Sequence, residues 1–179
     1  MTVWIALLRG VNVGGITIKS APLREVFVGM GFDEVTTVLA SGNVAFRSRR
    51  TGRRGLKLDI EKALRARFGY DAWIVLCTKA DVDAAARAFP FDATNPARQP
   101  YVIFGSDEAV LDELVAAAAS MDRLIDPVER GAGVAYWNPA AGSSTDTPFA
   151  KLLAKPKYKS TTTNRNLRTL QKVLAAAAD

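Results

Sequence analysis

The feature that most constrains the fold is an apolar run, residues 3–8, that leads directly into the sequence Arg-Gly-Val-Asn-Val-Gly-Gly of residues 9–15. Successive positions of the run are apolar, so we expect a strand that is buried on both faces and lies inside its sheet. Glycines where a buried strand ends leave backbone amides beside the Arg and Asn side chains, an arrangement common at ligand sites. The run therefore predicts a central strand and a place for a ligand, but it names no reaction.

Composition indicates an ordinary globular protein, because 49% of the 179 residues are hydrophobic and 23% are charged. This length suits one compact domain or two small halves that share a core. About six apolar residues precede Arg9, too few for a signal-peptide core, and no apolar stretch is long enough to span a membrane. The single cysteine, Cys77, can form no internal disulfide. We therefore expect a cytoplasmic protein with no membrane partner.

Hydrophobic periodicity and turn residues divide the first half of the chain into six elements. They are a strand over residues 3–8, a helix from about Pro22 to Gly31, strands over 34–40 and 44–47, a helix over 55–68 and a strand over 72–77. The turn Ser41-Gly42-Asn43 joins the two middle strands. This order, strand-helix-strand-strand-helix-strand, is the split βαβ pattern of a ferredoxin-like unit.

The second half repeats the order strand, helix, strand, strand. Thr78-Lys79-Ala80-Asp81 resembles a capping box and opens a helix, after which three prolines between residues 90 and 100 predict a linker. Further elements are expected as a strand over 101–104, a helix capped by Ser106, strands over 124–128 and 134–137 and a flexible loop over 138–144. A short helix over 149–154, capped by Thr147, and a basic loop over 155–160 follow. A terminal helix follows Thr161-Thr162-Thr163 and carries one stripe of leucines.

The predicted fold class is therefore α+β, with two tandem ferredoxin-like (βαββαβ-type) halves and a C-terminal helical extension. Residues 1–90 form the N-terminal ferredoxin-like half, residues 91–100 the linker, and residues 101–179 a C-terminal α+β half with the terminal helix.

Net charge is +6, and along the sequence the basic excess lies near the C-terminus. Residues 147–178 contain seven basic residues and no acidic one, and the rest of the chain is close to neutral. A second basic cluster, residues 47–57, is balanced by acidic residues of the same half and is also explained as a solvated basic loop. Because Thr hydroxyls and Arg165 stand where the terminal helix is expected to begin, this helix start predicts an anion site. Phosphate-bearing partners suit such clusters.

Three motifs, residues 7–15, 41–46 and 163–169, together resemble the bacterial domain of unknown function 1697 (DUF1697) family, in order and spacing over the length of the chain. The resemblance implies a compact α+β protein of two ferredoxin-like halves with no established activity. The family's terminal motif usually reads Thr-Thr-Arg-Asn-Trp. Here Asn164 precedes Arg165, and Leu167 stands at the aromatic position. The change favours a core role for that position over stacking on a ligand.

Several common chemistries are excluded by residue content. The chain has no histidine, so Ser-His and Cys-His arrangements are impossible. Cys77 ends an apolar strand and is expected to be a buried, inert thiol. No cluster of carboxylates suggests a metal site, and the glycine-rich loop has neither the P-loop ending nor the dinucleotide-binding spacing. No catalytic residue, metal or cofactor is therefore predicted.

We expect the motifs to bind a ligand through ten residues. They are Arg9, Gly10, Asn12, Gly14, Gly15, Ser41, Asn43, Thr163, Arg165 and Asn166. The favoured function is binding of a nucleotide, a nucleic acid or another phosphate-bearing ligand between the glycine loop and the terminal helix start. One alternative is an enzyme on a small anionic substrate that uses Arg9 and Arg165 as clamps. The other is a structural or interaction protein in which the motifs only form turns and Arg9 makes an ion pair.

Overall fold

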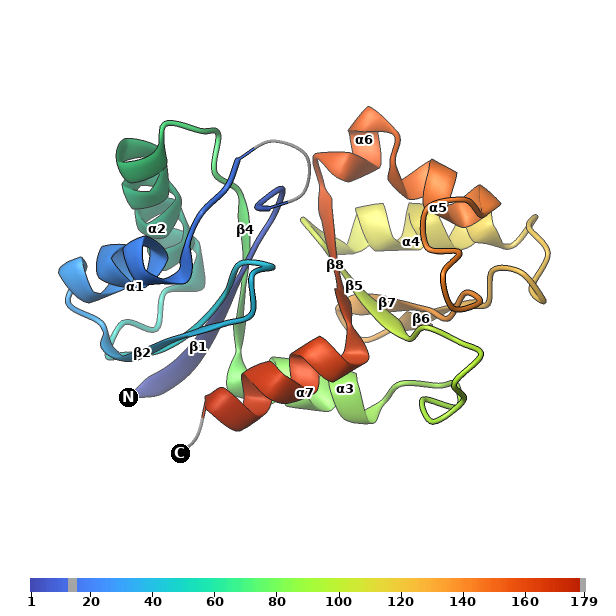
Figure 1. Ribbon diagram of the computed structural model, residues 1–179, viewed down its shortest axis with the longest axis horizontal. Helices are drawn as coiled ribbons and strands as arrows, with labels where there is room; N and C mark the ends of the chain where they lie inside the picture. Colours follow the sequence, from blue (N-terminus) through green and yellow to red (C-terminus); the bar gives the residue numbers. More distant parts are fainter. Residues whose placement is uncertain (13–15, 178–179) are drawn as a thin grey trace. The chain divides into compact units, whose positions relative to one another are not determined.

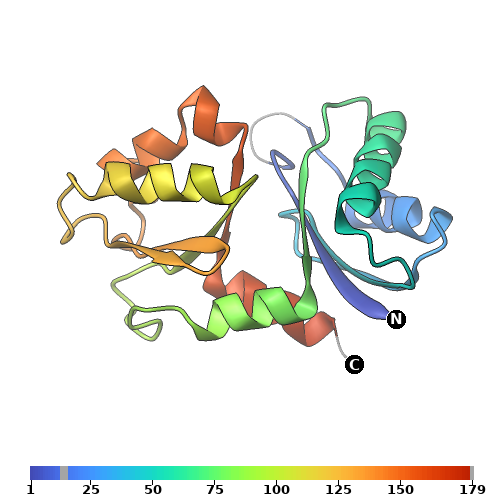
Figure 2. The same ribbon diagram turned by 180° about the vertical axis from the view of Figure 1, so that it is seen from behind.

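The computed structural model describes residues 1–12 and 16–177. Over these residues the chain forms seven helices and eight strands, and the strands make two four-stranded antiparallel sheets (Figures 1 and 2). The chain divides into two compact units. Unit 1 comprises residues 1–83 and 171–179, and unit 2 comprises residues 84–170. The fold is therefore α+β, and each unit is described by itself.

Unit 1 begins with six elements in the predicted order. They are β1 (Thr2–Leu8), α1 (Ser20–Gly29), β2 (Asp33–Val38), β3 (Asn43–Ser48), α2 (Arg53–Phe68) and β4 (Ile74–Thr78). The sheet order is β2-β3-β1-β4, so β1 lies inside the sheet as its apolar run predicts. Antiparallel pairing of β1 with β3 sets Leu7 opposite Asn43. The end of β1 and the turn before β3 therefore lie at the same end of the sheet.

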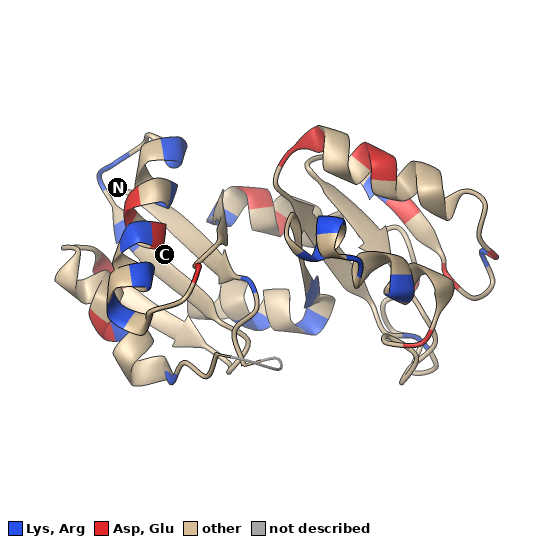
Figure 3. Ribbon diagram, turned by 90° about the horizontal axis from the view of Figure 1, so that it is seen from above, with Lys and Arg blue, Asp and Glu red and all other residues tan. Residues whose placement is uncertain are grey.

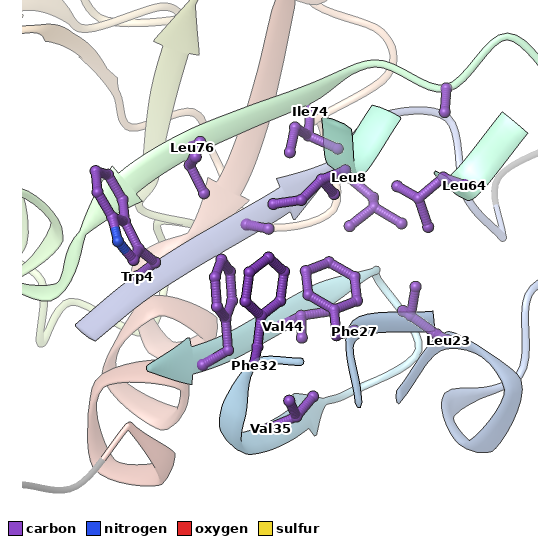
Figure 4. Close-up of a cluster of buried hydrophobic side chains, with 14 of the residues drawn as sticks. Trp4, Leu8, Leu23, Phe27, Phe32, Val35, Val44, Leu64, Ile74 and Leu76 are labelled. Atoms are coloured by element: carbon purple, nitrogen blue, oxygen red, sulfur yellow. The ribbon is translucent and has the colours of Figure 1, made fainter. Parts of the chain in front are cut away.

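The core of unit 1 lies between its sheet and the helices α1 and α2, which cover the same sheet face (Figure 1). In Figure 4, Leu8 and Ile74 of the sheet face Phe27 of α1 and Leu64 of α2. Alternate β1 residues on the other face, such as Ile5, are also fully buried. Burial on both faces explains why β1 has no polar residue after Thr2.

Unit 2 contains the remaining strands. The chain continues through α3 (Lys79–Arg87), β5 (Tyr101–Gly105), α4 (Glu108–Ala118), β6 (Val128–Gly131), β7 (Val134–Trp137), α5 (Pro148–Leu153), α6 (Pro156–Lys159), β8 (Thr162–Asn166) and α7 (Leu167–Ala176). The sheet order is β6-β7-β5-β8. Trp137 is fully buried in the core of this unit and packs against Phe149, with ring centres 5.4 Å apart. Both sheets thus place their first strand inside and their second and fourth strands at the edges.

Two predicted helix caps are confirmed by hydrogen bonds. At the start of α3, the Asp81 amide donates to Thr78 Oγ1 at 3.1 Å, and the Thr78 amide donates to Asp81 Oδ2 at 3.0 Å. At the start of α5, the Ala150 amide donates to Thr147 Oγ1 at 3.1 Å. Local sequence alone determines these caps, because each involves residues only three positions apart.

The segment before the terminal helix differs from its prediction. Residues 162–166 form strand β8, which pairs with β5 and sets Arg165 opposite Val102. The helix begins only at Leu167. The prediction of an anion site at a helix start spanning Thr163 to Asn166 is therefore wrong in its geometry. Consecutive threonines favour extended backbone, and pairing with a distant strand decides the outcome.

Smaller differences concern the loops and boundaries. The predicted basic loop over 155–160 contains α6, the strand expected over 124–128 begins only at Val128, and Asp107 rather than Ser106 caps α4. The compact units also divide the chain differently from the predicted domains. Their boundary follows Asp83, residues 91–100 belong to unit 2, and residues 171–179 belong to unit 1. The segment expected to be a linker is thus part of a compact unit.

Candidate functional site

The first two sequence motifs meet at the end of β1. The Leu8 amide donates to the Gly42 carbonyl at 2.8 Å. Gly42 has a φ of +72°, and a Cβ atom there would lie 2.9 Å from the Leu8 Cβ. Only glycine suits both the backbone conformation and this close approach. The sequence left open whether the glycine loop and the Ser41-Gly42-Asn43 turn are neighbours, and within unit 1 they are.

Asn12 stabilises the contact between the first two motifs through its side-chain hydrogen bonds. Its Nδ2 donates to the carbonyl of Ile18 at 3.2 Å and to the carbonyl of Ala40, and its Oδ1 accepts from the Ile18 amide at 2.9 Å. Its φ is 58°, in the left-handed region that Asn tolerates better than most residues. Both amide hydrogens are therefore engaged with backbone, which supports a structural role for Asn12.

Asn43 and Ser41 hold the hairpin turn in a similar way. Asn43 is fully buried, and its Nδ2 donates to the Val38 carbonyl and to Ser41 Oγ, each at 2.8 Å. A buried carboxamide needs such partners because an unmade hydrogen bond is costly there. The turn explanation therefore accounts for these two predicted site residues.

Arg9 follows β1 and is half-buried. Its guanidinium carbon lies 5.8 Å from the centre of the Trp73 ring, and Lys57 Nζ lies 5.2 Å from that ring, so two cations contact one aromatic side chain. Burial raises the pKa of Tyr70, and the charge of Arg9 opposes that rise. Gly10 is exposed with a φ of +69°. The predicted residues Gly14 and Gly15 lie outside the described residues.

Thr163 and Arg165 are buried on one face of β8. Arg165 is 7% exposed, and its Nη1 donates to Thr163 Oγ1 at 2.7 Å and to the Asn164 carbonyl at 2.9 Å. Burial lowers the pKa of Arg165 to about 10. Arg9 belongs to unit 1 and Arg165 to unit 2. A ligand site that both residues share therefore stays a prediction.

Unit 2 contains a cleft of about 340 Å³ where three segments of the chain meet. The segments are residues 96–100, residues 141–142 and the junction of β8 with α7. The lining residues are Pro96, Arg98, Gln99, Pro100, Ala141, Gly142, Asn166 and Arg168. Asn166, a predicted site residue, is thus placed at a cleft.

Backbone hydrogen bonds tie the three segments together. The Gln99 amide donates to the Pro139 carbonyl, the Ala141 amide donates to the Ala97 carbonyl, and the Leu167 amide donates to the Pro100 carbonyl, each at 2.9 Å. The prolines in these segments restrict φ further. The lining is therefore preorganised, although its parts come from a predicted linker and a predicted flexible loop.

Two arginines give the cleft its charge. Arg98 donates from Nη2 to the Leu124 carbonyl at 2.9 Å and from Nη1 to the Asn138 carbonyl at 3.3 Å, so neutral acceptors orient it and its charge is retained. Arg168 is exposed on the first turn of α7. None of the eight lining residues is acidic. This arrangement can bind an anion.

Asn166 completes the cleft at the N-terminus of α7. Its Oδ1 accepts from the Arg168 amide at 2.9 Å, which caps the helix and leaves the Nδ2 hydrogens as donors. The positive end of the helix dipole lies at the same place and also favours an anion. The side chain thus has a structural role and a group available to a ligand.

Sequence reasoning missed Arg98 and Gln99 because it assigned them to a linker. Arg168 lies in the basic C-terminal segment and in the third motif, but neither pattern marks it as a site residue. A weak signal was present, since Arg98 stands between two prolines in a stretch without acidic residues. The contact between segments almost 70 positions apart depends on pairing of β5 with β8, which the sequence analysis did not predict.

Most residues of the basic cluster over 47–57 make ion pairs. Arg50 pairs with Asp59 and Arg53 pairs with Asp81, each at 2.6 Å. The remaining recorded pairs of this cluster join Arg47 to Glu34 and Lys57 to Glu61. The cluster is therefore better explained as a charge-balanced surface than as a phosphate-binding track.

Helix α4 balances basic residues of unit 2. Lys157 lies 2.6 Å from the Glu113 carboxylate, and Arg130 lies 2.8 Å from Asp112. Figure 3 shows Lys and Arg spread over both units, with Asp and Glu on many of the same elements. The C-terminal segment that is purely basic in sequence is thus partly neutralised by a helix from elsewhere in the chain.

Cys77 is buried, and burial raises the pKa of its thiol to about 12. This agrees with the expected inert thiol, since a nucleophilic cysteine needs a lowered pKa. Within residues 1–12 and 16–177, no group of three or more His, Cys, Asp or Glu side chains could hold a metal ion. No helix of this part of the chain has the length and apolar character needed to cross a bilayer.

The family model described as a protein of unknown function (DUF1697) matches residues 1–136, which is more than half of the chain. The chain belongs to this family. The matched residues include the first two motifs of this DUF1697 member, whereas the third motif, residues 163–169, lies beyond the match. The cleft is therefore built from residues inside and outside the matched region.

Structural comparison supports the fold of this DUF1697 member. A conserved bacterial protein from Streptococcus pneumoniae has a similar structure, with a TM-score of 0.81, 23% sequence identity and 99% of each chain covered. At this identity the likeness shows the fold alone. An unknown protein from Galdieria sulphuraria gives a TM-score of only 0.28 at 11% identity, covering 98% of this chain and 88% of that one. No match is found among curated proteins.

Proposed function

We propose that this protein binds a phosphate-bearing ligand, and that the cleft of unit 2 is the binding site. The observation that carries the proposal is that both Arg98 and Arg168 line a cleft whose eight lining residues include no acidic one. Guanidinium groups donate paired hydrogen bonds to phosphate oxygens, which suits a nucleotide, a nucleic acid or another phosphate compound.

Four further properties of the cleft suit a small phosphate-bearing ligand. Its volume, about 340 Å³, lies at the lower end of the range for small-molecule sites. The N-terminus of the ten-residue helix α7 adds partial positive charge. Asn166 Nδ2 and Gln99 supply neutral donors beside the two cations. The backbone bonds between the segments reduce the ordering cost of binding.

Binding is favoured over catalysis. An enzyme acting on a small anionic substrate needs a group that moves a proton, and no carboxylate or histidine lines the cleft. The alternative of a structural role applies best to the motifs of unit 1, because the carboxamides of Asn12 and Asn43 already donate hydrogen bonds to backbone carbonyls or to the turn. The two roles therefore divide between the units.

The finer fold assignment belongs to the same proposal. We propose that each unit is a ferredoxin-like βαββαβ half, which is supported by the sheet order β6-β7-β5-β8 that repeats the arrangement β2-β3-β1-β4. Strand β8 supplies the sixth element of the second half, and α7 is then the C-terminal helical extension. A cytoplasmic location is also proposed, supported by the one buried, unpaired cysteine.

Calorimetric titration with AMP and with inorganic phosphate at low salt tests the site. We expect Arg168→Ala to weaken binding about tenfold, because one charge-assisted contact is lost. Lys172→Ala is the matched control. It removes the same charge four residues further along α7, at an exposed position that does not line the cleft. Equal effects of the two variants, or no binding to the folded protein, would contradict the proposal.

A further inference from the structure

We propose that the cleft selects a small phosphate monoester, such as a mononucleotide or a sugar phosphate, over the phosphodiester backbone of a nucleic acid. This inference rests on the proposed function and specifies its ligand class. The deciding observations are the charge balance of unit 2, the two arginines of the cleft and the size of the cleft.

A nucleic-acid site needs a track of basic side chains, because successive phosphates each require a cation. Residues 84–170 contain ten basic and nine acidic residues, a net charge of only +1. Outside the cleft, Arg123 pairs with Glu129, and Lys157 pairs with Glu113. Arg130 is held by two carboxylates of α4. These three basic residues of unit 2 are therefore neutralised, which weakens any basic track along which a polymer could bind.

The cleft itself concentrates positive charge in one place. Arg98 is fixed by two carbonyl groups, and three of its five N–H donors have no part in those bonds. Among the residues that the structure describes, Arg168 makes no side-chain hydrogen bond or ion pair. A phosphate monoester carries close to two negative charges at neutral pH and three terminal oxygens. A diester carries one charge and two such oxygens. Two guanidinium groups beside a helix N-terminus match the monoester better.

The size of the cleft also favours a small phosphate monoester. A volume of about 340 Å³ accommodates a phosphate with one attached sugar or nucleoside, and sites of this size typically enclose single small ligands. Pro96 and Pro100 supply apolar lining for the non-phosphate part. Gly142, with a φ of +82° and open space around its Cβ position, adds no side chain to the wall.

The experiment compares a phosphate monoester with the matching diester and with a polymeric phosphodiester. Methyl phosphate, dimethyl phosphate and a single-stranded oligonucleotide of about 16 nucleotides without a terminal phosphate are titrated into the full chain at the same low salt. We expect methyl phosphate to bind about tenfold more tightly than dimethyl phosphate. Arg168→Ala should remove most of that preference, whereas Lys172→Ala should keep it.

The outcomes separate this inference from the proposed function. Equal binding of the methyl and dimethyl esters, weakened by Arg168→Ala, would overturn the monoester selectivity and leave phosphate binding in place. Oligonucleotide binding that is tighter than monoester binding and equally sensitive to Arg168→Ala would overturn it in favour of a nucleic-acid ligand. If no probe binds and circular dichroism shows a folded protein, the proposed function itself is wrong.

Discussion

Asn12 follows the end of strand β1 and Asn166 is the last residue of strand β8, yet the structure uses the two side chains differently. The carboxamide of Asn12 gives both of its hydrogens to backbone carbonyls and accepts from a backbone amide. Asn166 accepts one helix amide through Oδ1, and within the described part of the chain its Nδ2 donates to no protein group. The number of hydrogen bonds already made separates a structural Asn from one that can bind a ligand.

The largest expected effect tests the structural role of Asn12. Asn12→Ala removes three hydrogen bonds and places Ala at a φ of 58°, so we expect the free energy of unfolding to fall by about 2–4 kcal/mol. Chemical denaturation measures this loss. Affinity for phosphate should not change.

Asn12→Gly separates the two contributions. Glycine tolerates the left-handed backbone, so this variant should lose the side-chain hydrogen bonds without the strain, and it should be more stable than Asn12→Ala. A variant at position 12 that keeps wild-type stability but loses phosphate binding would reverse the roles that we assign to the two asparagines.

The next effect tests the contact between the first two motifs. Gly42→Ala combines a φ of +72° with a Cβ atom only 2.9 Å from Leu8, so we expect a loss of about 2–3 kcal/mol. Gly10→Ala is its control, because Gly10 has a similar φ of +69° and nothing within 4 Å of a Cβ atom. That variant should lose only about 1 kcal/mol. Equal losses in thermal unfolding would show that the close approach at Gly42 has no consequence.

Local patterns predicted most of unit 1, and long-range pairing explains what they missed in unit 2. The apolar run at β1 and the capping box at the start of α3 depend on residues near one another, so the sequence predicts them well. Strand β8 contains only Thr, Asn and Arg, with no apolar alternation to reveal it. Its pairing with β5 moves Arg165 into the interior and leaves Asn166 at the cleft. For the same reason, the sequence did not predict which charges of the basic segment are neutralised, since Glu113 and Lys157 are 44 positions apart in the chain.

The variant Asn166→Asp tests the role of Asn166 in ligand binding. Aspartate caps a helix as well as asparagine does, so the stability should stay within about 0.5 kcal/mol of wild type. The new negative charge faces the same cleft as Arg98 and Arg168, so phosphate affinity should fall about tenfold, roughly 1.4 kcal/mol. Calorimetry and denaturation of one protein preparation measure both quantities. Unchanged affinity would place the ligand elsewhere.

The smallest expected effect concerns Glu113, a carboxylate of α4 that forms an ion pair with Lys157. Hydrogen bonds from Lys157 and Tyr158 lower the pKa of Glu113. A lowered folded-state pKa contributes stability that is present above the unfolded-state pKa and is lost as the pH falls through the folded-state value. Glu113→Gln should therefore lower the stability slightly at neutral pH and leave it unchanged at acid pH, so that chemical denaturation measured against pH gives a flatter profile on the acid side.

The same variant tests the ligand class, because it releases Lys157 and raises the net charge of residues 84–170 from +1 to +2. We expect oligonucleotide binding at low salt to increase slightly, while binding of methyl phosphate stays constant, because Glu113 does not line the cleft. Fluorescence anisotropy of a labelled oligonucleotide measures the change. If methyl phosphate affinity rose as much as oligonucleotide affinity, the general charge of unit 2, and not the two cleft arginines, would control binding.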